Sequence, residues 1–285
     1  MGALMKFNRI VFALVTIVAF AAIGAVLSLI FSRFVDFSNA KGIETSAKKT
    51  KQTADTVAYN PPRLQDAPAD IKDAVMLGYN IMMDTRKYAA GYVGNKLNCT
   101  NCHFNGGITE GGKNGGLSLS GVATKYPEYR KQAKGISDLL SRTNSCFEKS
   151  MNGKPLPLDS EEMIALVTYY QWISKGLPIY ADIPWLGLKH IKSAHTPDPA
   201  DGKQIFAQQC AMCHGNTGAG TQAAPPLWGN DSFNDGAGMH KMENLAAFAY
   251  NNMPKTNPDL TAEQALDVAA FVSAQPRPHF VTKKK

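Results

Sequence analysis

The sequence lacks the interleaved basic and aromatic side chains that are typical of proteins that bind single-stranded nucleic acid. Its formal net charge is +7, but the lysines are densest in the stretch 41–51 and in a C-terminal run of three. We therefore expect no nucleic-acid partner. Charge is also sparse, because only 19% of the residues are charged whereas 44% are hydrophobic. This composition excludes a disordered chain, and 285 residues are enough for two folded domains.

Charged residues are absent from the stretch 10–31. As a helix it would be about 33 Å long, roughly the thickness of the hydrocarbon core of a bilayer. A cleaved signal peptide is the alternative, because Lys6 and Arg9 precede the stretch and the small residues at 38–40 resemble a cleavage site. Length favours an anchor, since the apolar core of a signal peptide usually has about 7 to 15 residues. We predict a transmembrane helix within residues 1–31 and a flexible polar linker at 32–69.

The rest of the sequence repeats one plan twice: a helix, a Cys-x-x-Cys-His motif, a glycine-rich loop and a closing helix with an apolar face. The helices are expected at 70–88 and 160–176 in the first copy, and at 198–209 and 261–274 in the second. Because Cys-x-x-Cys-His is the motif that attaches a c-type haem, the predicted fold is all-α, with two tandem class I-like cytochrome c domains at residues 70–190 and 191–285.

Capping residues mark the start of each closing helix. We expect Asp159 to cap the first one, because Glu162 follows three positions later. Thr261 and Gln264 are expected to form a capping box at the second.

Five cysteines in an exported protein would ordinarily indicate disulfides. Here the spacing indicates haem attachment, because two cysteines three positions apart followed by histidine bind both vinyl groups of one haem and its iron. A redox dithiol does not need the histidine, and a zinc site needs four ligands in one pattern. We predict two covalently bound haem c groups outside the cytoplasm. The predicted attachment residues are Cys99, Cys102, Cys210 and Cys213, and the predicted proximal iron ligands are His103 and His214.

The fifth cysteine, Cys146, lies in the first domain, ahead of the closing helix. A lone cysteine is often a small buried hydrophobe. This part of the domain is also where the second axial ligand of the first iron is expected, and Met151 is a nearby alternative. A thiolate ligand would lower the reduction potential of the iron, whereas a methionine would raise it.

The second domain offers several distal ligands for its iron: Met239, His240, Met242 and Met253. Met253 precedes a proline and a short loop into the closing helix, which is how many small c-type cytochromes present their methionine. We favour Met253, with Met239 as the second choice.

Several motifs follow one another along the chain in a specific order. The first Cys-x-x-Cys-His is followed by KYPEYR, RTNSCFEKSMNGKPL, CAMCHG, PPLWG, SFNDGAGM and NNMP. Over roughly residues 70–276 this order resembles the dihaem thiosulfate dehydrogenases, some of which work as tetrathionate reductases. The resemblance implies that Cys146 is the distal ligand of the first haem and belongs to the active site.

The same resemblance implies the composition of the substrate pocket. Arg142 and Ser150 match residues that line it, and either Arg130 or Lys131 would supply a second basic group. Some family members have a lysine immediately before the second-haem methionine, where this chain has Asn252. We therefore expect no ligand switch between lysine and methionine.

The implied reaction joins two thiosulfates into tetrathionate, or runs in reverse, and passes electrons from the first haem through the second. Cationic side chains suit it because the two dianions repel each other, and a second haem suits it because two electrons are released. We expect a periplasmic enzyme, anchored to the inner membrane, whose redox partner is another cytochrome c or a respiratory complex. The alternatives are a dihaem electron carrier without substrate chemistry and another sulfur-oxyanion cytochrome. Cys146 discriminates, because a pure carrier gains little from a thiolate ligand.

Overall fold

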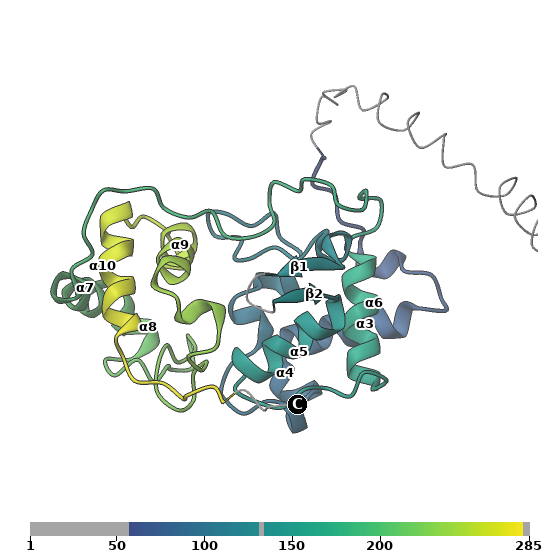
Figure 1. Cartoon of the computed structure of the whole chain (residues 1–285), viewed down its shortest axis with the longest axis horizontal. Coiled ribbons are helices and arrows are strands. Elements are labelled where there is room, and N and C mark those ends of the chain that lie inside the picture. The colour runs from purple at the N-terminus through teal and green to yellow at the C-terminus, as the bar shows by residue number, and fades with distance from the viewer. Residues whose placement is uncertain (1–56, 131–133, 282–285) are drawn as a thin grey trace, which may run out of the picture. The chain divides into compact units, whose positions relative to one another are not determined.

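The computed structural model describes residues 57–130 and 134–281 (Figure 1). The predicted anchor at 10–31 and the linker up to residue 56 lie outside the described residues. Among the residues that are described, no helix has the length and the apolar character needed to cross a membrane.

The first domain has two long helices that pack against each other, α3 (Lys72–Met83) and α6 (Glu161–Trp172) (Figure 1). Val75, Ile81 and Leu166 are fully buried in its core. The remaining helices of this domain are α4 (Thr85–Tyr88), α5 (Leu139–Lys149) and the 3₁₀ turns η2 (Leu64–Asp66), η3 (Ala90–Tyr92), η4 (Cys99–Asn101), η5 (Phe104–Gly107) and η6 (Val122–Lys125).

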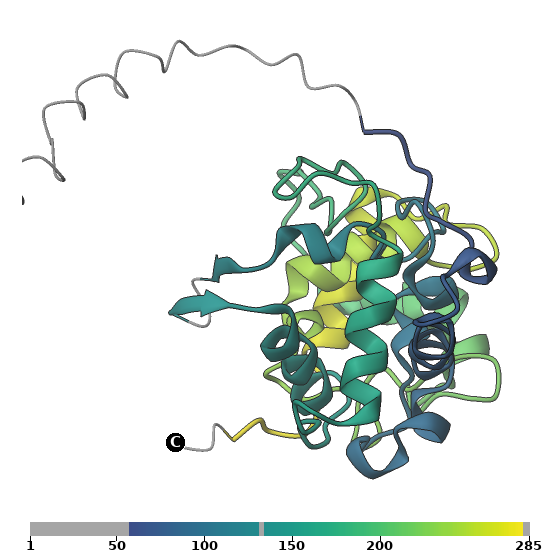
Figure 2. The ribbon, with the colours of Figure 1, turned by 90° about the vertical axis from the view of Figure 1, so that its right-hand side faces the viewer.

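A small hairpin precedes α5. Strands β1 (Glu128–Arg130) and β2 (Gly135–Ser137) are antiparallel, with Tyr129 opposite Ile136. The hairpin extends away from the helices in Figure 2. Within the described residues this is the only sheet, so the prediction of a mainly helical protein is confirmed.

The second domain is closed by α10 (Ala262–Ser273), which packs on α7 (Pro199–Ile205) and α9 (Met242–Asn252) (Figure 1). Phe206, Trp228 and Phe271 form an aromatic cluster with ring centroids 5.0–5.8 Å apart. A π-helical turn, η8 (Phe206–Cys210), leads into α8 (Ala211–His214), and η9 (Gly238–His240) precedes α9.

Both domains use a glycine where the opening helix crosses the closing helix. A Cβ on Gly78 would overlap the carbonyl oxygen of Ala165, and a Cβ on Gly202 would overlap that of Asp267. The close approach of the two helices therefore depends on glycine in each domain.

The two closing helices, α6 and α10, are each capped by a hydroxyl side chain. The Thr261 side chain and Gln264 form the predicted capping box. The prediction for Asp159 was wrong, because the Ser160 hydroxyl accepts the hydrogen bond from the Met163 N–H. Either residue fits an N-cap sequence pattern, and the observed cap has the helix start one residue later.

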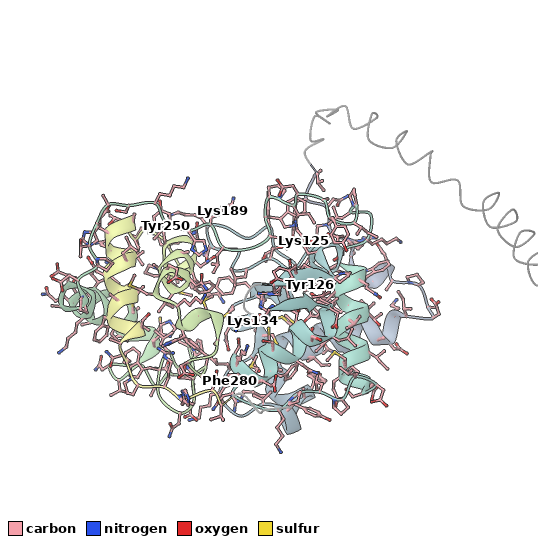
Figure 3. All side chains as sticks on the ribbon, viewed as in Figure 1. Lys125, Tyr126, Lys134, Lys189, Tyr250 and Phe280 are labelled. Atoms are coloured by element: carbon pink, nitrogen blue, oxygen red, sulfur yellow. The ribbon has the colours of Figure 1, made fainter. Side chains whose placement is uncertain are left out.

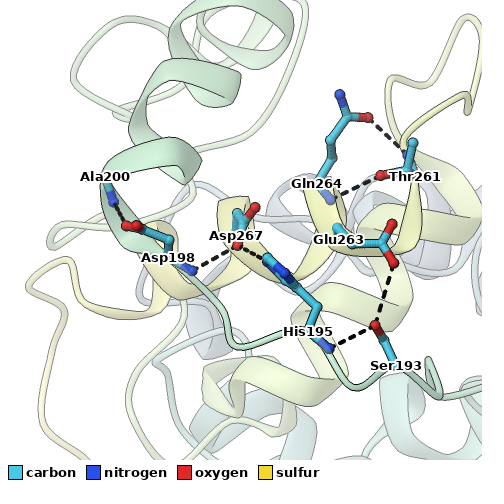
Figure 4. A network of polar contacts seen from close by, with 8 residues as sticks. All are labelled: Ser193, His195, Asp198, Ala200, Thr261, Glu263, Gln264 and Asp267. Carbon is cyan, nitrogen blue, oxygen red and sulfur yellow. Dashed lines mark hydrogen bonds and ion pairs between the residues drawn. The ribbon is translucent and has the colours of Figure 1, made fainter.

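The entry into the second domain is held by a polar network (Figure 4). The buried Asp267 carboxylate, on α10, contacts His195 Nε2 at 2.6 Å and accepts the Asp198 N–H at 2.7 Å. The preceding segment packs instead on the first domain, where the Trp185 indole donates to the Ser120 carbonyl at 2.8 Å. The domain boundary near residue 190 stays a prediction.

Candidate functional site

The first Cys-x-x-Cys-His motif forms a tight turn after Asn98. The side chain of Asn101 accepts the Asn98 N–H at 2.7 Å, and the His103 N–H donates to the Cys99 carbonyl at 2.9 Å. The buried Thr85 hydroxyl holds Cys99, because it accepts the Cys99 N–H at 2.9 Å and lies 3.2 Å from the Cys99 sulfur. The turn therefore presents the cysteines and the histidine together.

The imidazole of His103 is oriented by the glycine-rich loop that follows it. Its Nδ1 lies 2.9 Å from the carbonyl oxygen of Leu117, so Nδ1 carries the proton and donates, which leaves the lone pair of Nε2 for a metal. Burial lowers the pKa of His103 to about 4, which keeps the ring neutral, the form that binds iron.

The second motif repeats this arrangement. The Nδ1 atom of His214 donates to the Pro225 carbonyl at 2.8 Å, and burial lowers the pKa of His214 as well. The Thr221 hydroxyl donates to the Cys213 carbonyl at 2.6 Å. At both motifs the donor set is two thiols and one neutral imidazole with a free Nε2, which fits one covalently bound haem each.

Helix α5 carries Cys146 together with two other predicted site residues. Arg142, Cys146 and Ser150 are four positions apart, so they lie along one face of α5 and its C-cap. The helix starts at Asp138, whose carboxylate accepts the Ser141 N–H at 2.7 Å. Arg142 Nη1 donates to the Cys146 sulfur at 2.7 Å. A negative charge on Cys146 raises the pKa of Arg142 further above its ordinary value, so the guanidinium stays charged.

Helix α5 lies close to the first haem attachment motif, since Phe147 of α5 is buried in the core cluster against which Cys99 packs. Burial, and after it the charge of Cys146, raises the pKa of the Cys102 thiol to about 12. Arg142 adds a smaller electrostatic contribution to the lowered pKa of His103. The alternative ligand Met151 is 4% exposed and packs in the core of the first domain, with its N–H bonded to the Cys146 carbonyl at 2.9 Å.

The other predicted basic residue, Arg130, lies on β1. Its Nη1 is 3.3 Å from the Tyr126 hydroxyl and 3.3 Å from the Glu128 carboxylate. Tyr126, which is labelled in Figure 3, lies near both arginines. Burial raises the pKa of Tyr126, while the positive charges of Arg142 and Arg130 lower it. Lys131, the alternative to Arg130, lies outside the described residues.

Two residues near this site carried no assignment from the sequence. Tyr126 belongs to the KYPEYR motif, which was a usable signal, but nothing in the motif shows that its hydroxyl lies beside Arg130. Thr85 lies 14 positions before Cys99, and no sequence pattern links the two.

The two methionine candidates of the second domain pack in different places. Met253 packs against the core of the second domain, together with Phe206 and Leu260. Met239 packs against the hydrophobic cluster that contains the core of the first domain together with Phe233 and Ala237. The choice of Met253 over Met239 stays a prediction.

The fold is repeated, and each of the two histidines is neutral and donates its Nδ1 proton to a backbone carbonyl. These features define a dihaem c-type cytochrome. Its first domain matches the family model described as the SoxA/TsdA cytochrome c domain, over residues 93–179. Its second domain matches the model described as cytochrome c oxidase, cbb3-type, subunit III, over residues 197–272. Both models support a haem c in each domain.

Whole-protein comparisons narrow the class. The thiosulfate dehydrogenase of Stutzerimonas stutzeri is 41% identical over 228 residues, covering 77% of this chain and 73% of that protein. The thiosulfate dehydrogenase of Allochromatium vinosum is 34% identical over 233 residues, covering 79% and 86%. The solved thiosulfate dehydrogenase (TsdBA) from Marichromatium purpuratum matches with a TM-score of 0.71 and 30% identity, covering 77% of this chain but only 49% of that one. The chain belongs to the thiosulfate dehydrogenase family, as an enzyme with two covalently bound haem c groups.

Proposed function

We propose that this protein oxidises two thiosulfates to tetrathionate, or catalyses the reverse reaction, at the face of α5 that carries Arg142 and Cys146. The observation that supports this most strongly is the 2.7 Å hydrogen bond from Arg142 Nη1 to the Cys146 sulfur, beside the first haem attachment motif. A pure electron carrier gains little from a thiolate ligand with a cationic substrate pocket beside it.

Arg142 would overcome the repulsion between the substrates. Two dianions about 5 Å apart repel each other by roughly 13 kcal/mol at an effective dielectric constant of about 20. A guanidinium about 4 Å from one dianion attracts it by roughly 8 kcal/mol under the same conditions. One cation that contacts both dianions therefore offsets the repulsion. Arg130 or Lys131 would add a second charge, and the hydroxyls of Tyr126 and Ser150 would donate to oxyanion oxygens.

Cys146 would serve as the distal ligand of the first haem and as the sulfur nucleophile. When its sulfur bonds the outer sulfur of one thiosulfate, a cysteine S-thiosulfonate forms and two electrons are released. A second thiosulfate then attacks that outer sulfur, so tetrathionate leaves and the Cys146 thiolate returns. A haem iron changes its oxidation state by one electron, so two haems accommodate the two electrons.

The second domain would pass the electrons on. We propose His214 and Met253 as its iron ligands, supported by the packing of Met253 in the core of that domain. The ring of Phe104, directly after His103, lies edge-on to Phe248 of α9 with centroids 6.1 Å apart, so the segment after the first iron ligand packs directly on the second domain. The acceptor would be another cytochrome c or a respiratory complex.

The proposed location is the bacterial periplasm, because covalent haem attachment to Cys-x-x-Cys-His takes place after export. Anchoring to the inner membrane by residues 10–31 remains part of the proposal, supported by the absence of charge from that stretch.

The test compares Cys146→Gly with Met151→Leu in the full chain matured with both haems. Each protein is assayed with thiosulfate plus an artificial acceptor and with tetrathionate plus a reduced donor. We expect Cys146→Gly to lose nearly all turnover in both directions and Met151→Leu to retain it. Full activity of Cys146→Gly would leave the dihaem electron carrier as the better account.

A further inference from the structure

One of the contacts between the two domains joins the glycine-rich loop after His103 to the end of α9. Asn252, the last residue of α9, is 1% exposed and directly precedes Met253. Its side-chain oxygen accepts the Gly116 N–H of the first domain at 2.8 Å. Its side-chain nitrogen donates to the Phe248 carbonyl of its own helix at 3.0 Å. Both ends of the amide are thus bonded to backbone groups in a buried place.

Gly116 is itself next to a residue of the first haem site. The neighbouring Leu117 carbonyl accepts the His103 Nδ1 proton at 2.9 Å, and the Leu117 N–H donates to the Cys102 carbonyl at 2.8 Å. A short series of bonded groups therefore runs from His103 through Leu117 and Gly116 to Asn252, and from there along the backbone to Met253.

Other contacts hold the same interface independently of Asn252. The Asn114 N–H donates to the Asn251 carbonyl at 2.8 Å, and the Lys255 ammonium lies 4.6 Å from the ring centroid of Phe104. Loss of the Asn252 side chain would therefore change the local position of the Met253 loop without separating the domains.

We propose that Asn252 is a positioning residue that fixes the Met253 loop against the first domain, so that coordination of the second iron depends on the contact between the domains. This inference rests on the proposed role of Met253 as an iron ligand. A buried amide with both ends bonded resists displacement, because moving it would leave buried N–H and C=O groups without partners. The loop that presents Met253 is thereby held in a fixed position relative to the first domain.

The experiment uses the full chain with both haems and three variants. Asn252→Ala removes both side-chain bonds, and Asn252→Asp keeps the acceptor for the Gly116 N–H. Asn251→Ala is the matched control, because the Asn251 side chain donates to Ala247 of its own helix at 2.8 Å and not to the glycine-rich loop. The readouts are the near-infrared methionine-to-iron band, followed during heating, and the reduction potential of each haem.

We expect the band of Asn252→Ala to disappear at a lower temperature than that of the parent, and the potential of the second haem to fall while that of the first stays. Asn252→Asp should lie between Asn252→Ala and the parent, and Asn251→Ala should match the parent. A parent-like band and potential in Asn252→Ala would overturn the proposal.

Two further measurements separate the possible failures. Met253→Ala should abolish the band, and a retained band would overturn the ligand assignment itself and the proposal with it. If Asn252→Ala does not mature with both haems, hydrogen exchange of the parent protein tests the bond between Gly116 and Asn252 instead. The Gly116 amide should then exchange as slowly as the bonded Leu117 amide, and rapid exchange would refute the bond to Asn252.

Discussion

Replacing Arg142 with alanine should weaken substrate binding and lower the reduction potential of the first haem. The guanidinium is half-buried and donates to the Cys146 sulfur at 2.7 Å, so the bond is short and charge-assisted. Hydrogen bonds to charged groups are worth about 1.5 to 3 kcal/mol. Loss of one such bond to thiosulfate should raise its KM by about 10- to 150-fold.

The contact with Cys146 also predicts a change in the reduction potential of the first haem, which the sequence alone did not indicate. A ligand sulfur that loses a hydrogen-bond donor and a nearby positive charge stabilises the oxidised iron, so the potential of the first haem should fall. Arg142→Lys keeps the charge but loses the planar fork, so both effects should be smaller.

The assay is steady-state thiosulfate oxidation combined with a redox titration that resolves the two haems. Arg63→Ala is the matched control, because the Arg63 side chain is exposed and pairs with Asp66 at the surface. An Arg142→Ala protein with an unchanged KM and an unchanged potential would refute the assignment of Arg142 to the site.

Three further predictions concern the fold and the haems. Gly78→Ala should lower the stability by about 1 to 3 kcal/mol in thermal unfolding, because its Cβ would overlap the Ala165 carbonyl. Gly91→Ala, which has open space around it, should not, and equal stability of the two variants would contradict the close helix crossing. Asp267→Ala should cost about 1 to 3 kcal/mol in chemical denaturation, since the Asp198 N–H and His195 lose the buried carboxylate as their partner, and an unchanged midpoint would argue against the network. Denaturing mass spectrometry should show the polypeptide plus two haems, and only one after replacement of Cys210 and Cys213 by alanine; one haem in the parent would contradict a second attachment site.

Features that are local in the sequence could be predicted. The Cys-x-x-Cys-His spacing is set by the geometry of one haem, so both attachment sites are visible without a structure. The same holds for the capping box of Thr261 and Gln264, whose two bonds span three positions. Arg142 and Cys146 are one helical turn apart, but no helix was predicted for residues 139–149, so their contact was not foreseen from the sequence.

Features that depend on distant parts of the chain could not be predicted. The bond between Gly116 and Asn252 joins residues 136 positions apart, and the sequence indicates only that Asn252 precedes a methionine. Phe233, assigned to the second domain by its position, packs in the core of the first because the domains share an interface. Burial of this kind is decided by tertiary packing and leaves no periodic signal.

The central claim is that the protein joins two thiosulfates through a sulfur–sulfur bond. The most direct test is the stoichiometry of the purified holoprotein with thiosulfate and a one-electron acceptor, with the sulfur products separated by ion chromatography. We predict one tetrathionate for every two thiosulfates consumed and two equivalents of acceptor reduced. Acceptor reduction without tetrathionate, or no reaction of thiosulfate in either direction, would contradict the account.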